Sequence, residues 1–334
     1  MSDSPTLSPG KVAVIGAGAW GTAVALLMAQ KGLEVALWAR RREQAEAMLA
    51  MRENREYLPG IALPANLQPT SSAAEALEGA ALAVVAVPSR ALAQTLAPMP
   101  RAPAYLSLTK GLAYTDDGLT RMSQVIAAVT RAERVAALSG PNLAEEIARF
   151  QPAASVVASS DAALARWVQK LLTGPSFRVY TSNDIVGVEL GGALKNVIAL
   201  AAGMVDGLRL GDNAKASLMT RALREIVRFG VAQGAQSETF YGLSGLGDLI
   251  ATCTSLHSRN RGAGEKIARG TTLRELEAGK QVVEGIYTVK ALHEWGQRSG
   301  VEMPITEAVW RVVYQGEKPL EVLSALMGRE AKPE

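Results

Sequence analysis

Residues 11–25 read KVAVIGAGAWGTAVA, and three glycines of this segment directly follow an apolar run and open a helical pattern. They have the spacing GxGxxG. In a strand–turn–helix unit the first glycine permits the tight turn and the second lets the backbone approach a pyrophosphate. The third allows the helix to pack closely on the strand. Glycines also serve ordinary tight turns, but the strand, the helix and the position in the first βαβ unit agree here. The segment predicts a dinucleotide site with contacts at Gly16, Gly18, Ala19, Trp20 and Gly21.

The first half of the chain alternates short apolar runs with helical patterns. Strands are expected at 12–15, 35–38, 82–87, 104–108, 135–138 and 153–157, and intervening helices at 21–30, 41–50 and 91–96. Strands separated by helices indicate βαβ units in a mostly parallel, doubly wound (Rossmann) sheet.

From residue 184 onward the pattern is almost entirely helical. The expected helices are 184–208, 214–233, 261–269, 289–299 and 305–314. We therefore predict an α/β plus all-α protein with a disordered tail over 1–10, a Rossmann dinucleotide-binding domain over 11–182 and a helical substrate-binding domain over 183–330. A ligand is expected in the cleft between two such domains.

Composition excludes several classes of protein. The net charge of +3, with both signs interspersed, argues against a nucleic-acid partner. No apolar run approaches the roughly 18 residues of a membrane span, and the N-terminus lacks the pattern of a signal peptide, so a cytoplasmic protein is expected. One cysteine and two histidines allow no internal disulfide and do not favour a metal site. An apolar helical domain also suggests a homodimer.

The end of the second expected strand bears on the choice of cofactor. An NAD site usually has an acidic residue there to bind the ribose 2′-hydroxyl. This chain instead has Arg40, Arg41 and Arg42. Guanidinium groups suit the 2′-phosphate of NADP, whereas a solvated basic turn at a helix start is the structural alternative. We predict that NADPH is accepted and preferred, with Arg40 and Arg41 as contacts.

A series of motifs in fixed order resembles the bacterial NAD(P)-dependent glycerol-3-phosphate dehydrogenases. These motifs are GAGAWGTAVA, VPS, LTKG, SGPNLAEEIA, VELGGALKNVIALAAG, GDNAKASLMTRALREI, GLGDLIATC and SRNR, and they span roughly 11–315. The resemblance implies reversible reduction of dihydroxyacetone phosphate to sn-glycerol 3-phosphate with NADP or NAD as the cofactor. It also implies a supply of glycerol phosphate for glycerophospholipid synthesis.

The resemblance assigns residues to that chemistry. Lys195 matches the catalytic lysine. The matches to substrate contacts are Lys110, Gly140, Asn142, Asp248, Ser258, Arg259 and Asn260, and the further matches near the cofactor are Lys110, Ala144, Arg259, Val282 and Glu284. The sequence departs from the family pattern at two places near the expected substrate contacts. Asn142 stands where many relatives have Ser or Thr, and Leu256-His257 is a less usual pair of residues before SRN.

The residues themselves support this chemistry. Reduction of a ketone develops negative charge on oxygen, which requires a proton donor. Lys195 lies in an apolar, glycine-rich helical stretch, where burial is expected to lower its pKa, although a lone lysine commonly extends to solvent. Asp248 is the second candidate catalytic residue, because it could pair with Lys195 or form a hydrogen bond with a substrate hydroxyl; the structural alternative is that it caps a helix. Ser258-Arg259-Asn260 offers a cap, a guanidinium and backbone N–H groups to a phosphate, or is an exposed capping segment.

Three other reactive side chains have simpler interpretations. His293 is expected at the surface of an amphipathic helix, His257 beside the phosphate site, and Cys253 as a small buried hydrophobic residue.

Two other functions remain open at this point. A β-hydroxyacid dehydrogenase or ketopantoate reductase has a similar two-domain plan and a catalytic lysine, but its substrate carries a carboxylate. A non-catalytic NAD(P)H-binding sensor would bind the cofactor without turnover, and it would leave Lys195 and Asp248 without a role.

Overall fold

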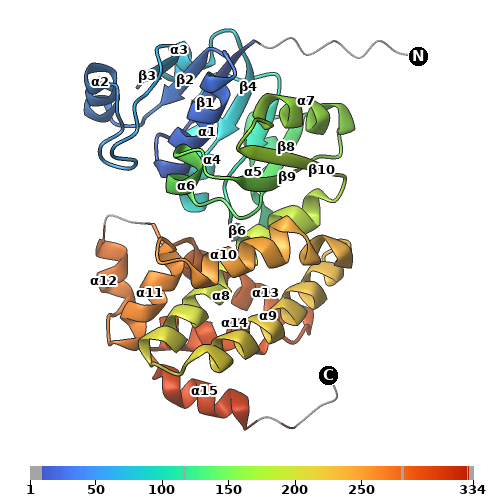
Figure 1. Cartoon of the computed structure of the whole chain (residues 1–334). Coiled ribbons are helices and arrows are strands. Elements are labelled where there is room, and N and C mark those ends of the chain that lie inside the picture. Colours follow the sequence, from blue (N-terminus) through green and yellow to red (C-terminus); the bar gives the residue numbers. More distant parts are fainter. Residues whose placement is uncertain (1–9, 116–117, 280–281, 329, 331–334) are drawn as a thin grey trace. The chain divides into compact units, whose positions relative to one another are not determined.

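The computed structural model describes residues 10–115, 118–279, 282–328 and 330 (Figure 1). The chain folds into two compact units. The first runs to Thr109 and resumes over Met122–Val188, and the second holds Lys110–Arg121 and the chain from Glu189 onward. Residues 110–121, inside the predicted Rossmann range, therefore belong to the second unit. Residues 1–9 of the predicted tail lie outside the described residues.

The first unit is built on an eight-stranded sheet in the order β10-β9-β8-β5-β4-β1-β2-β3. The strands are β1 Lys11–Ile15, β2 Val35–Trp38, β3 Leu67–Thr70, β4 Ala80–Val85, β5 Tyr105–Ser107, β8 Val135–Ser139, β9 Ala153–Ala158 and β10 Phe177–Ser182. Neighbouring strands are parallel except β8 and β9, which run antiparallel. The predicted doubly wound, mostly parallel sheet is confirmed.

The strands that the sequence does not predict are the two edges of this sheet. The six predicted strands correspond to β1, β2, β4, β5, β8 and β9. The edge strands β3 and β10 alternate buried and less buried residues, and β3 contains a proline. An edge strand pairs on one side only and tolerates proline there, so it lacks the continuous apolar run of an inner strand.

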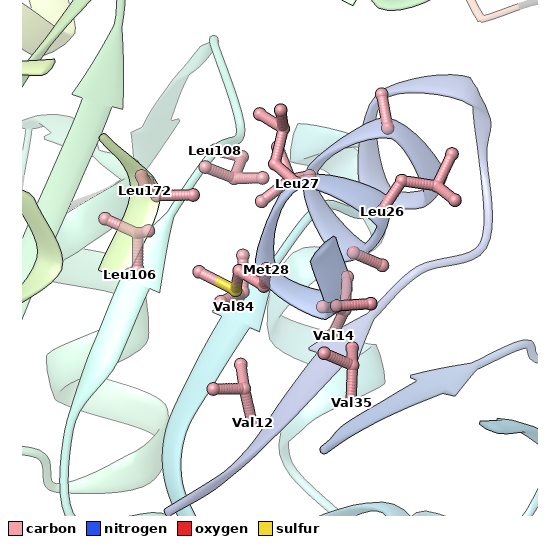
Figure 2. Close-up of a cluster of buried hydrophobic side chains, with 14 of the residues drawn as sticks. Val12, Val14, Leu26, Leu27, Met28, Val35, Val84, Leu106, Leu108 and Leu172 are labelled. Carbon is pink, nitrogen blue, oxygen red and sulfur yellow. The ribbon is translucent and has the colours of Figure 1, made fainter. Parts of the chain in front are cut away.

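Helices pack on this sheet and close its core. They are α1 Ala19–Gln30, α2 Arg42–Met51, α3 Ala73–Leu77, α4 Leu92–Leu96, α5 Met122–Thr130, α6 Ala144–Ala148 and α7 Ala162–Leu172, with a 3₁₀ turn at Ser89–Ala91. Figure 2 shows the side chains of α1 lying over the inner strands. Leu26 and Met28 of α1 are buried in one cluster with Val12, Val14 and Val84. Because α1 is buried along nearly its whole length, its first turn is fixed at the carboxyl end of β1.

The second unit is helical apart from one β-hairpin. Its helices are α8 Ile185–Gly207 (which begins in the last residues of the first unit), α9 Asp212–Ala232, α10 Asp248–Thr254, α11 Arg259–Ala268, α12 Leu273–Ala278, α13 Glu284–Ser299, α14 Pro304–Trp310 and α15 Pro319–Met327. A 3₁₀ helix spans Ser237–Tyr241, and short π-helical segments span Leu243–Gly247 and Arg311–Gln315. The hairpin consists of β6 Leu112–Thr115 and β7 Gly118–Arg121. The hairpin packs on α13. The predicted helical C-terminal domain is confirmed, with this hairpin added to it.

Helix α8 is the central element of the second unit. No segment with the character of a membrane span is expected from the sequence, but among the described residues α8 is the one helix with that length and apolar composition. Of its apolar window, 89% is buried inside the protein. Burial on all sides explains why it is apolar around its whole circumference.

Glycines let neighbouring backbones approach α8 closely. A Cβ on Gly203 would lie 1.9 Å from the carbonyl oxygen of Arg261 on α11, and one on Gly191 would lie 2.6 Å from that of Ser244. Larger residues would push these segments away. The two close approaches fix the start of α11 and the segment before α10 against the helix that carries Lys195.

Candidate active site

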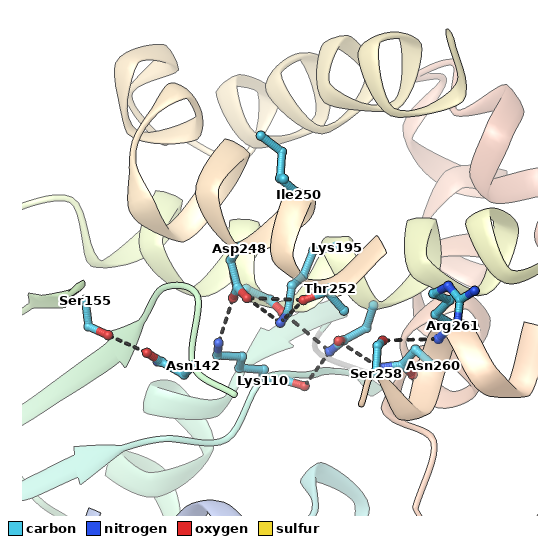
Figure 3. Close-up of polar contacts among 12 residues, drawn as sticks. Lys110, Asn142, Ser155, Lys195, Asp248, Ile250, Thr252, Ser258, Asn260 and Arg261 are labelled. Atoms are coloured by element: carbon cyan, nitrogen blue, oxygen red, sulfur yellow. Dashed lines mark hydrogen bonds and ion pairs between the residues drawn. The ribbon is translucent and has the colours of Figure 1, made fainter. Parts of the chain in front are cut away.

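Lys195 points into a polar cluster within the second unit (Figure 3). Its side chain is buried, and its Nζ donates to Asp248 Oδ1 at 2.5 Å and to Thr252 Oγ1 at 2.6 Å. Asp248 and Thr252 lie four residues apart on α10, so both face α8. The alternative of a lysine extending to solvent is wrong. Asp248 makes no side-chain cap of α10 and pairs with the amine instead.

Lys110, two residues before the hairpin, reaches the same carboxylate. Its Nζ donates to Asp248 Oδ2 at 2.6 Å, and its side chain is 14% exposed. Burial lowers the pKa of Lys110 from 10.5 to about 8, Asp248 opposes this shift, and the charge of Lys195 adds to it. One buried carboxylate therefore lies between two buried amines.

Two amines share one carboxylate in this arrangement. With both amines protonated, the group of Lys110, Lys195 and Asp248 has a net charge of +1 in a site from which water is largely excluded. Two amines in a largely buried site interact favourably with a nearby negative charge. The cluster is thus suited to an anion, or to a carbonyl oxygen on which negative charge develops.

Two buried asparagines connect the cluster to α11 and α13. Asn196 Nδ2 donates to the Lys110 carbonyl at 3.4 Å, and Asn260 Nδ2 donates to Asn196 Oδ1 at 2.9 Å. Asn260 Oδ1 in turn accepts from the Gly285 N–H at 2.9 Å. Both ends of the Asn260 amide are therefore engaged with protein groups, and its predicted substrate contact stays a prediction.

The predicted phosphate segment lies at the start of α11. Ser258 Oγ accepts from the Arg261 N–H at 3.2 Å, so the predicted cap is present. Arg259 is the first residue of the helix and its side chain is exposed. The bond between Asn260 and Asn196 holds this helix start next to the residue that follows Lys195.

In the first unit, the glycine-rich turn has the form that a dinucleotide requires. Gly16 has φ +115°, and a Cβ there would lie 2.6 Å from the Ala86 carbonyl oxygen. A Cβ on Gly21 would lie 2.0 Å from the Gly16 carbonyl oxygen, whereas nothing lies within 4 Å of that position at Gly18. The first turn of α1 has no side-chain cap and no acidic residue. The buried Trp20 Nε1 has no hydrogen-bond partner among the described residues. These features fit a pyrophosphate at a helix N-terminus.

The three arginines after β2 differ in their surroundings. Arg41 pairs with Glu56 and Arg42 with Glu46. Arg40 is exposed, and within the described part of the chain no side-chain hydrogen bond or ion pair of Arg40 is seen. Arg40 is therefore the best placed of the three to bind a ligand phosphate.

The remaining predicted residues fall in both units. Gly140, with φ +144°, follows β8, and a Cβ there would lie 3.0 Å from Ser155 Cα. Asn142 Oδ1 accepts from Ser155 Oγ at 2.5 Å, and Ala144 is the first residue of α6. In the second unit, Val282 and Glu284 flank the residue before α13, and Glu284 opens that helix.

The sequence reasoning missed Thr252 and gave Asn196 no role of its own. Thr252 was detectable, because it follows Asp248 by one helical turn. Asn196 was visible as the neighbour of Lys195, but its bond to the Lys110 carbonyl joins segments 86 residues apart.

The predicted surface position of His293 is wrong. Its ring is largely buried, lies 3.5 Å from the Trp310 ring, and its Nδ1 lies 2.7 Å from Glu307 Oε2. Cys253 is fully buried, which raises its pKa to about 12, so it is a buried small residue as predicted. In the described ranges, no three His, Cys, Asp or Glu side chains are grouped to hold a metal ion.

Comparison with known proteins identifies similar sequences over nearly the whole chain. Residues 11–165 match the family model described as NAD-dependent glycerol-3-phosphate dehydrogenase N-terminus, and residues 184–324 match the corresponding C-terminus. The glycerol-3-phosphate dehydrogenase (NAD(P)+) of Thermus thermophilus is 62% identical over 97% of this chain and 100% of its own length. That of Deinococcus radiodurans is 54% identical over 96% of each chain.

Solved structures agree with these sequence matches. The crystal structure of glycerol-3-phosphate dehydrogenase from Coxiella burnetii has a TM-score of 0.90 and 36% identity, covering 96% of this chain and 99% of that one. A ketopantoate reductase from Ralstonia eutropha has a TM-score of 0.60 and 16% identity, covering 94% of this chain and 99% of that one, a likeness of fold alone.

Proposed function

The chain belongs to the NAD-dependent glycerol-3-phosphate dehydrogenase family, and we propose that it reversibly reduces dihydroxyacetone phosphate to sn-glycerol 3-phosphate with NADPH or NADH. The observation that carries this proposal is the buried cluster of Lys195, Asp248, Thr252 and Lys110. In this proposal residues 11–182 bind the dinucleotide, and residues 183–330 together with Lys110 bind the triose phosphate.

Lys195 is the proton donor of the proposed reaction. A lysine ammonium has three N–H groups. In Lys195, one donates to Asp248 and a second donates to Thr252. The third is directed to the ketone oxygen and passes its proton to the alkoxide that forms there. In the reverse direction the neutral amine takes the proton of the C2 hydroxyl. A reduced nicotinamide cofactor, when bound, would supply the hydride.

Lys110 and Arg259 supply the remaining charge in this proposal. The two amines of the lysine cluster stabilise the developing alkoxide, and the exposed guanidinium of Arg259 binds the phosphate. Asp248 holds the two amines near each other despite their repulsion. The predicted contacts of Gly140, Asn142 and Ser258 with substrate, and of Ala144, Val282 and Glu284 with cofactor, belong to the same proposal.

The cofactor would be held by the glycine-rich turn and by α1. The Gly18 backbone and the uncapped first turn would bind the pyrophosphate, Trp20 Nε1 would donate to a ligand oxygen, and Arg40 would bind the 2′-phosphate of NADP.

The test is a substrate panel with matched variants. Oxidation of NADPH and of NADH is followed with dihydroxyacetone phosphate, ketopantoate and small β-keto acids. Turnover of a keto acid and none of the triose phosphate would overturn the proposal. Lys195→Met should abolish turnover and leave NADPH binding within about twofold. Lys215→Met is the control, because it removes a similarly buried amine that pairs with Asp206 at 2.5 Å; it should retain turnover.

We also propose that the enzyme works in the cytoplasm as a homodimer and supplies glycerol phosphate for glycerophospholipid synthesis. A single cysteine suits a reducing compartment. Exposed Leu320 and Met327 on α15 give the second unit apolar surface that a second copy would cover. Light scattering during size-exclusion chromatography tests the dimer, which a monomer mass would refute.

A further inference from the structure

The carbonyl of Ala17 lies between the first two glycines of the turn and accepts two side-chain amides. Asn54 Nδ2 donates to it at 3.0 Å, and Gln44 Nε2 donates at 2.8 Å. Gln44 comes from α2 and Asn54 from the segment between α2 and β3. The two amides therefore converge on one peptide group of the glycine-rich turn from positions 27 and 37 residues away.

Asn54 also bonds to the helix that follows the turn. Its Nδ2 donates to Thr22 Oγ1 at 2.8 Å, and the side chains of both residues are buried. The Thr22 N–H donates to the Gly18 carbonyl at 2.9 Å. One buried amide thus joins the turn and the first turn of α1.

The segment that carries Asn54 is itself fixed. The Asn54 carbonyl accepts from the Leu58 N–H at 2.8 Å, and Leu58 is buried. Asn54 is consequently held from both its backbone and its side chain, so its Nδ2 has little freedom to leave the Ala17 carbonyl.

Fixing this carbonyl also fixes the N–H that follows it. In a trans peptide the C=O and the N–H point in opposite directions, and the described residues contain no cis peptide. Because the Ala17 carbonyl is bonded toward Asn54 and Gln44, the Gly18 N–H of the same peptide group is directed away from them. At Gly18 nothing lies within 4 Å of the position of a Cβ, so the space beside its Cα is open.

We propose that Asn54, together with Gln44, is a positioning residue for the dinucleotide, because it orients the Ala17–Gly18 peptide group with its N–H toward the pyrophosphate. This inference rests on the proposed function only in requiring that the first unit binds a dinucleotide. Asn54 acts through the peptide group and touches no ligand.

The chain offers a matched control at the other end of the same helix. Asn66 Nδ2 donates to the Ala29 carbonyl at 2.7 Å and to the Leu33 carbonyl at 2.8 Å. Asn66→Ala therefore removes two comparable hydrogen bonds from the end of α1 that is remote from the glycines. Either substitution should lower the stability of the protein. Only Asn54→Ala should also lower the affinity for the dinucleotide.

The experiment is calorimetric titration of the full chain with NADPH, NADH and ADP-ribose, with thermal unfolding of each variant. ADP-ribose carries the pyrophosphate without the nicotinamide, so it tests the turn independently of catalysis. Asn54→Ala should weaken all three ligands about tenfold, equivalent to about 1.4 kcal/mol, and raise the KM for NADPH in parallel. Asn66→Ala should lower the Tm and leave each Kd within about twofold.

The results separate the positioning role of Asn54 from the proposed function. Unchanged ADP-ribose affinity in Asn54→Ala, or an equal loss in Asn66→Ala, overturns the positioning role. If Asn54→Ala does not fold, Gln44→Ala carries the test, because it removes a donor to the same carbonyl from a half-buried position; an unchanged Kd there also overturns it. Failure of the wild-type chain to bind any of the three ligands refutes the proposed function instead.

Discussion

The buried amine of Lys110 makes the stability of this protein depend on pH. Its pKa is about 8 in the folded chain against 10.5 ordinarily. Below about pH 8 the Lys110 amine is protonated in both the folded and the unfolded chain. The folded state is then destabilised by the full cost of burying the charge. Between about pH 8 and 10.5 the folded state has lost the proton while the unfolded state keeps it. Stability therefore rises with pH across this window.

The size of the effect follows from the two pKa values. Each pKa unit corresponds to 1.36 kcal/mol, so the contribution of Lys110 to the free energy of unfolding rises by about 3 kcal/mol from pH 8 to pH 10.5. Since the side chain is only 14% exposed, solvent screening reduces this figure little.

The assay compares urea unfolding of the wild type and of Lys110→Met at several pH values from 7 to 10.5. Groups remote from this cluster contribute equally to both chains, so the difference between the two curves reports the titration of Lys110 within its charged cluster. The wild type should gain about 3 kcal/mol relative to the variant across the window. Parallel curves from pH 8 to 10.5 would refute the assigned pKa and with it the burial argument.

Activity gives a second measure of the same group. If the charge of Lys110 is needed for an anionic substrate, kcat/KM should fall above about pH 8 in the wild type. Lys110→Arg should move that fall to higher pH, because a guanidinium stays protonated. An unchanged alkaline limb in this variant would show that another group controls it.

Three further substitutions test other parts of the structure. Arg40→Asp should raise the KM for NADPH about tenfold or more and change the KM for NADH by less than about twofold. Arg42→Asp is the control. If Arg40→Asp still prefers NADPH, Arg40 does not bind the 2′-phosphate. Glu225→Ala removes a buried carboxylate that accepts hydrogen bonds from the Ile305 and Thr306 N–H groups and from the Thr306 hydroxyl at the start of α14. The free energy of unfolding, measured by denaturant titration, should fall by about 3 kcal/mol. A fall of less than about 1 kcal/mol would contradict a structural role. Gly203→Ala would place a Cβ 1.9 Å from the Arg261 carbonyl oxygen on α11. The Tm should therefore fall and the KM for dihydroxyacetone phosphate should rise. Wild-type values of both the Tm and the KM would disprove the close approach.

The features that could be predicted from the sequence are those that depend on one continuous segment of the chain. The glycine-rich turn, the inner strands and the long apolar helix each occupy one continuous segment, and their periodicity or spacing is visible without a fold. Lys195 could be singled out because an amine among apolar residues and glycines is unusual.

Features that depend on distant segments could not be read in the same way. Nothing in the spacing indicates that Lys110 shares a carboxylate with Lys195, or that Asn54 bonds to the turn 37 residues earlier. His293 was misplaced for a related reason, because the Trp310 ring that covers it belongs to another helix.

The course of the chain through its two units has a consequence for any attempt to divide the protein. The backbone passes from one unit to the other after Thr109, after Arg121 and after Val188. A gene fragment that begins at residue 183 would therefore encode the carboxylate of Asp248 and only one of its two lysine partners. Separate expression of the second unit would require the 110–121 segment to be grafted back through a designed linker, and exchange of halves between relatives would have to preserve all three passages of the backbone.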